Sequence, residues 1–158
     1  MKKPLFLLCS TALILQLASC RSTVPVTATP GASTPNTPLA ELRNTRWVLR
    51  SLNNRAIVTP ANGEAYILLR NQELRAEGNA GCNRFGGTFT LTKPGELEFG
   101  PLMSTRMACL SDQDNTTEQG FLAALKATRT YQISGDTLRL YAPASPTPAA
   151  VLHAVYLH

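Results

Sequence analysis

Apolar and polar residues alternate over short stretches of this chain from residue 39 onward, a period of two that is typical of β-strands with one buried face. In 45–52, Trp47 and Leu49 fall on one face, and Val48 and Leu52 fall on the other. Residues that favour turns, mainly asparagine, glycine and proline, separate the stretches. We predict strands at 45–52, 65–70, 74–78, 88–92, 96–99, 130–134, 137–141 and 151–157.

One segment, 112–128, has the helical period instead. Phe121, Leu122 and Leu125 form one apolar stripe, which we expect to be buried. Lys126 and Arg129 follow toward the C-terminal end, where cations complement the helix dipole. Candidate N-terminal caps are Asp114, Thr116 and Thr117, and Glu118 favours the first turn.

These elements predict a mainly β fold with one α-helix. The strands are short and mostly joined as hairpins, so a strongly curved, mostly antiparallel sheet is expected. Curling such a sheet into a small barrel buries its edges, and the helix would cover an opening. Phe89 and Leu91 share one face of their strand, and the side chains expected to face inward from the later strands are Leu97, Phe99, Tyr131, Ile133, Leu138 and Leu140.

The first 38 residues differ from this domain. Lys2 and Lys3 precede an apolar run at 5–17 that is too short for a transmembrane anchor, so 1–19 is predicted to be a signal peptide. It ends in Leu-Ala-Ser followed by Cys20, which resembles the bacterial lipobox. Cys20 is then the predicted lipidation site; an ordinary signal cleavage site is the alternative.

Residues 20–38 read as a tether rich in proline, threonine and serine, with too few large apolar residues to form a core. The folded domain is therefore placed at 39–158. Arg21 follows the lipidated cysteine in place of an aspartate that would favour the inner membrane, which points to the outer membrane of the cell envelope. The predicted membrane contact is thus the lipid anchor.

Of the four cysteines, Cys9 leaves with the signal and Cys20 takes lipid. Cys82 and Cys109 remain as an even pair in an oxidising compartment, which favours a disulfide. Two buried thiols or a metal site are the alternatives. A metal site is disfavoured because the chain has no Cys-x-x-Cys and only two histidines, near its end.

Two cysteine-centred motifs carry a family resemblance. The first is 78–87, with Gly81-Cys82-Asn83 followed by Phe-Gly-Gly, and the second is 104–109, Ser-Thr-Arg-Met-Ala-Cys. Together with Trp47 and the helix, they make the chain similar to the META (HslJ-like) domain family from about residue 42 to 157. The resemblance implies a small barrel-like fold, an envelope location and a link to stress tolerance, and no catalytic activity.

The polar residues around the two cysteines form a candidate recognition patch. Asn79, Asn83, Arg84, Thr105 and Arg106 would converge if the disulfide forms. Such a patch suits an envelope protein partner or an anionic ligand. The alternative is structural: asparagine and threonine satisfy turn backbone, and the arginines face water.

The sequence offers no convincing catalytic, metal or cofactor site. Ser104 and Thr105 lack a nearby histidine, since the only ones are His153 and His158. Glu96 and Glu98 sit two apart, as on a solvated strand face.

The glycine-rich 78–87 matches no phosphate-binding pattern. The net charge of +5 falls to +3 without the two signal lysines, and the remaining arginines are scattered, so no nucleic-acid partner is expected.

We therefore expect a non-enzymatic outer-membrane lipoprotein that supports envelope stress tolerance through protein contacts or scaffolding. The alternative is a module that binds a lipid or another small apolar ligand inside the barrel, in the manner of a lipocalin or a pilot chaperone.

Overall fold

The structure is a computed structural model, and it describes residues 40–60 and 63–156. The predicted signal peptide, Cys20, the tether and His158 lie outside the described residues. The described residues all belong to one compact unit. No helix in the described part of the chain combines the length and apolar composition that a membrane crossing requires.

Ten strands and one helix make up residues 40–60 and 63–156, which confirms the predicted fold class. The helix α1 spans Asp112–Ala127. The strands are β1 (Arg46–Leu52), β2 (Arg55–Ala56), β3 (Tyr66–Leu69), β4 (Arg75–Asn79), β5 (Arg84–Thr90), β6 (Glu98–Phe99), β7 (Met103–Ser104), β8 (Thr130–Ser134), β9 (Thr137–Tyr141) and β10 (Ala150–Val155).

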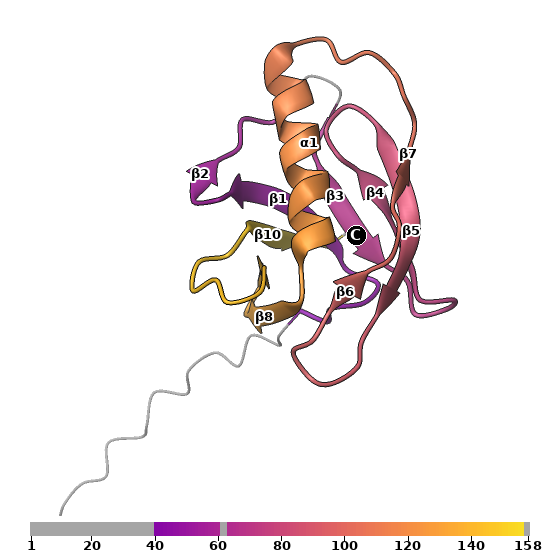
Figure 1. Ribbon diagram of the computed structural model, residues 1–158, viewed down its shortest axis with the longest axis vertical. Coiled ribbons are helices and arrows are strands. Elements are labelled where there is room, and N and C mark those ends of the chain that lie inside the picture. The colour runs from indigo at the N-terminus through magenta and orange to yellow at the C-terminus, as the bar shows by residue number, and fades with distance from the viewer. Residues whose placement is uncertain (1–39, 61–62, 157–158) are drawn as a thin grey trace, which may run out of the picture. The chain divides into compact units, whose positions relative to one another are not determined.

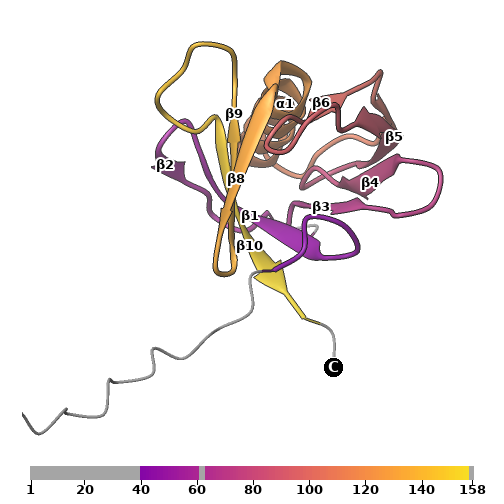
Figure 2. The ribbon, with the colours of Figure 1, turned by 90° about the horizontal axis from the view of Figure 1, so that it is seen from below.

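All strand pairs are antiparallel, in the order β6-β5-β4-β3-β1-β10-β9-β8. The short β2 pairs with β1, and β7 pairs with β5. The two ends of this sheet also meet: Leu97 donates its N–H to the Arg129 carbonyl at 3.0 Å, and Tyr131 donates to the Gly95 carbonyl at 2.8 Å. This bridge joins the ends of the curved sheet and gives it a barrel-like form (Figure 2).

The helix packs against the sheet and contacts β6, β9, β1 and β10 (Figure 2). Phe121 and Leu125 are fully buried, as predicted, but Leu122 is only half-buried. Ala124 is buried instead of Leu122, so the buried face of the helix is rotated about the helix axis relative to the predicted stripe. Ser111, not one of the predicted caps, is the N-cap, and its hydroxyl accepts from the Asp114 N–H at 3.1 Å.

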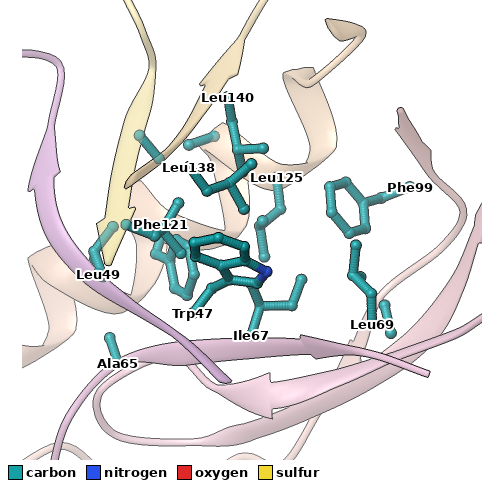
Figure 3. Packing of buried hydrophobic residues seen from close by; sticks show 14 of the residues in the cluster. Trp47, Leu49, Ala65, Ile67, Leu69, Phe99, Phe121, Leu125, Leu138 and Leu140 are labelled. Atoms are coloured by element: carbon teal, nitrogen blue, oxygen red, sulfur yellow. The ribbon is translucent and has the colours of Figure 1, made fainter. Parts of the chain in front are cut away.

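Side chains fill the interior of the barrel. Trp47 is fully buried and lies among Ile67 of β3, Phe121 and Leu125 of the helix, and Leu138 of β9 (Figure 3). Its indole N–H donates to the Leu42 carbonyl at 2.9 Å, which satisfies the one polar atom of this large side chain. The core is therefore a packed one.

Two strand predictions were wrong for identifiable reasons. Leu52 was expected opposite Trp47, but it belongs to the core, because the pairing of β1 with β10 shifts between Leu49 and Ser51. A bulge of one extra residue reverses the alternation beyond it. The strand predicted at 88–92 in fact starts at Arg84, within the glycine-rich motif.

Candidate functional site

A disulfide confirms the predicted pairing of Cys82 with Cys109, whose Cα atoms are 5.5 Å apart. It joins the turn between β4 and β5 to the long connection from β7 to α1. We call β7 together with this connection the arch, residues 103–111. Figure 1 shows it passing from β7 to the start of the helix at one end of the barrel.

Asn83, next to the disulfide, ties the arch to the barrel. The residue is buried, with 3% of its surface exposed. The Oδ1 atom accepts from the Thr105 hydroxyl at 2.7 Å and from the Met107 N–H at 2.8 Å. The Nδ2 atom donates to the Met107 carbonyl at 3.1 Å. The Asn83 amide thus makes the hydrogen bonds to Thr105 and Met107 that a neighbouring strand would make to a regular strand.

Glu118 of the helix completes the network from a third segment. Its carboxylate accepts from the Asn83 backbone N–H at 2.6 Å and from Asn83 Nδ2 at 3.0 Å. Hydrogen bonds to an ionised acceptor are stronger than neutral ones. The β4–β5 turn, the arch and the helix are therefore held together around a single residue.

The turn itself is set by Asn79 and Gly81. The Asn79 side chain accepts from the Gly81 N–H at 2.6 Å, a local bond of the kind asparagine makes in turns. Gly81 has a φ of +116° and lies against Pro60. A side chain at this position would be disfavoured both by the backbone and by the contact. This accounts for the Gly-Cys-Asn sequence of the first motif.

The arch exposes large apolar side chains although its backbone is fixed. Met103, Met107 and Leu110 are 80%, 61% and 73% exposed. They account for half of the six large apolar residues that are exposed in the described part of the chain. Clustering of exposed apolar side chains is a feature of interaction sites, whereas isolated ones are ordinary.

Two arginines stand beside these apolar residues. Arg84 starts β5, and its carbonyl accepts from the Thr105 N–H at 3.0 Å, so it lies against the arch. Arg106 is in the arch itself. Both side chains are exposed, and neither forms an ion pair with a carboxylate of residues 40–60 or 63–156. We call Arg84, Met103, Arg106, Met107 and Leu110 the arch surface.

A family model for the META domain matches residues 40–153. The chain belongs to the META domain family. The match contains both cysteine motifs, the helix and most of the barrel, so the disulfide and the arch lie inside the META domain.

Two solved NMR structures resemble this META domain. One is 27% identical, with a TM-score of 0.55, over 71% of this chain and 90% of the other. The second, from Burkholderia xenovorans, is 24% identical, with a TM-score of 0.60, over 85% of this chain and all of the other. The second likeness is one of fold alone. No curated protein matches this chain.

The META domain brings four of the five predicted patch residues together: Asn83, Arg84, Thr105 and Arg106. Asn83 is buried within the network, and the Asn79 side chain bonds to Gly81 in the β4–β5 turn. The exposed residues of the predicted patch are therefore the two arginines and Thr105. Sequence reasoning missed the three apolar residues of the arch and Glu118. Three large apolar residues in a segment without strand or helix period were an available signal for the arch.

The candidate nucleophiles and carboxylates lie in ordinary surroundings. The Thr105 hydroxyl is used by Asn83, and His153 is exposed on β10, which is four strands from β5 in the sheet order. Glu96 pairs with Lys93 at 3.5 Å, and Glu98 pairs with Arg129 at 3.8 Å.

The cysteine pair also has a carboxylate near it. Ligand atoms of Cys82, Cys109 and Glu118 lie within 4.8 Å of one another. Because the two sulfur atoms are bonded to each other, neither is a thiolate that could bind a metal ion. Glu118 is also already used as the acceptor for Asn83.

Proposed function

We propose that this META domain is the folded part of a non-enzymatic bacterial outer-membrane lipoprotein. It supports envelope stress tolerance by binding another envelope protein through the arch surface. The observation that carries the contact role is the exposure of Met103, Met107 and Leu110 on a segment that a disulfide and Asn83 hold in place. A fixed backbone lowers the entropy lost when a partner binds.

The composition of the arch surface fits a protein partner with acidic and apolar side chains. Methionine and arginine are enriched at protein interfaces, and methionine adapts its shape to a partner. Arg84 and Arg106 offer two cations that no carboxylate among the described residues pairs with. The partner should therefore present an acidic group beside an apolar contact.

Two features support an extracytoplasmic, lipid-anchored location. A disulfide is a feature of proteins from oxidising compartments. The signal peptide and Cys20 supply the predicted anchor. Replacing Cys20 by alanine should release the protein from the membrane fraction, and unchanged membrane association would contradict lipid anchoring.

The packed interior favours a contact role over the alternative of a ligand held inside the barrel. Trp47, Phe89 and Phe121 are fully buried there with seven fully buried isoleucine and leucine side chains. A lipocalin-like cavity needs a hollow interior of the barrel. The separation of His153 from the arch likewise supports a non-enzymatic role.

The test is complementation of a deletion strain under heat or antibiotic stress. The double variant Arg84→Ala and Arg106→Ala should fold normally and fail to restore survival. The matched control, Arg55→Ala with Lys93→Ala, removes two exposed cations elsewhere and should restore it fully. Full rescue by the arch double variant would refute the arch surface as the contact.

A further inference from the structure

A second surface lies between the helix and the connection from β6 to β7. It is a groove of about 640 Å³ lined by Phe99, Gly100, Pro101, Leu102, Leu122, Ala123, Lys126 and Arg129. This volume is within the range of small-molecule sites, about 300–1,000 Å³. None of these residues belongs to the arch surface, so the groove is independent of the proposed function.

The floor of the groove is apolar. Leu102 and Leu122 are half-buried and pack against the core, and Phe99, which belongs to that core, also lines the groove. Leu122 is the residue that the helical pattern predicted to be buried, yet it borders this groove. The hollow beside the arch differs, since most of its lining is polar, although Met107 and Leu110 also border it.

Positive charge lies at one end of the groove. Leu122 and Lys126 are four residues apart and share a helix face. Lys126 makes no ion pair with a described carboxylate, and its side chain is exposed. Arg129 is partly engaged: its Nη1 donates to the Lys126 and Thr128 carbonyls, and its Nε lies 3.8 Å from Glu98.

An apolar floor with an unpaired ammonium at one end matches a single-chain anionic amphiphile. We propose that the groove binds a fatty acid, with the chain over Leu102 and Leu122 and the carboxylate at Lys126. Arg129 adds positive potential, which Glu98 partly cancels, so most of the preference for an anion should come from Lys126.

The proposal is tested by adding dodecanoate, below its micelle concentration, to residues 36–158 and following methyl resonances by NMR. This fragment suffices because the described core lies within it. Saturable shifts should centre on Leu102 and Leu122. Dodecyltrimethylammonium, which has the same chain and the opposite charge, should bind more weakly. Shifts elsewhere only, or equal binding of both amphiphiles, would overturn the proposal.

Two pairs of variants separate the chain contact from the charge contact. Leu122→Asp should weaken dodecanoate binding by at least about tenfold, because it places a charge on the apolar floor. Leu110→Asp, the same change on the arch surface, should leave binding unchanged. Wild-type affinity in Leu122→Asp would refute the groove.

For the charge contact, Lys126→Ala should weaken binding by about threefold to fivefold, the range of an exposed ion pair. Lys93→Ala is the matched control and should have no effect. Equal affinity in the two lysine variants would refute the carboxylate contact at Lys126. Because Lys126 is exposed, this pair gives an answer even if Leu122→Asp does not fold.

Discussion

Asn83 is the position at which one substitution should release the arch from the barrel. Asn83→Ala removes four side-chain hydrogen bonds with nitrogen and oxygen partners: two from Thr105 and Met107 to Oδ1, and two from Nδ2 to Met107 and Glu118. It also removes a weaker one, from Nδ2 to the Cys82 sulfur at 3.5 Å. At about 1 kcal/mol net for each bond, the free energy of unfolding should fall by about 4 kcal/mol. That is a large share of the free energy of unfolding of a typical domain, which is roughly 5–15 kcal/mol.

The assay is urea unfolding followed by the fluorescence of Trp47, the only tryptophan, which is fully buried. The matched control is Asn79→Ala. It lies in the same motif but loses one bond, to the Gly81 N–H, so it should cost about 1 kcal/mol. The midpoint should shift with an unchanged slope in both variants if unfolding stays two-state.

A volume-preserving variant separates hydrogen bonding from packing. Asn83→Asp keeps the size of the side chain but replaces the Nδ2 donor with a carboxylate oxygen. In the wild type, Nδ2 lies 3.0 Å from Glu118 Oε1, so the new oxygen would face that carboxylate. It should be at least as destabilising as Asn83→Ala at neutral pH, because like charges at this distance repel. If Asn83→Ala costs no more than Asn79→Ala, the reasoning about the network is refuted.

Three further predictions concern the disulfide, a glycine pair and a surface tyrosine. Replacing both cysteines by alanine should cost about 3–4 kcal/mol, since the bond closes a loop with a sequence separation of 27; an unchanged urea midpoint would contradict this. Gly87→Ala should lower the Tm, because its Cβ would lie 2.5 Å from a backbone carbonyl, whereas Gly86→Ala meets nothing closer than 3.7 Å and should be nearly neutral; equal Tm values would refute this. The Tyr156 hydroxyl donates to Asp136 at 2.7 Å, and this bond raises the pKa of Tyr156 above its ordinary value of 10.0. The bond should therefore stabilise the fold below pH 10.0 and stop doing so as the pH rises through the raised pKa. Ultraviolet titration of Asp136→Asn should show the pKa of Tyr156 falling back toward its ordinary value.

The helix and the hairpin that follows it were predictable because their signals are local. The helix was expected at 112–128 and runs over Asp112–Ala127, and the strands expected at 130–134 and 137–141 have these bounds. A hydrophobic stripe and a Gly-Asp turn are each read within a few residues. No long-range contact is needed to find them.

The misses came from contacts between distant segments. The glycines of β5 hid a strand, because they resemble a turn signal, whereas Gly87 is small to admit the chain at Pro101. The bulge in β1 depends on its pairing with β10, about a hundred residues away in sequence. The bond between Asn83 and Glu118 spans 35 residues, so the motif marks the position of Asn83 but not its partner.

The most direct test of the account is site-specific photocrosslinking from the arch surface in living cells. A photoreactive residue at Met107 should give one discrete adduct with an envelope protein, and the double variant Arg84→Ala and Arg106→Ala should abolish it. The same probe at Gln132, an exposed position on β8, should give no such adduct. An adduct that forms equally from both positions, or that survives loss of both arginines, would contradict the arch surface as the binding site.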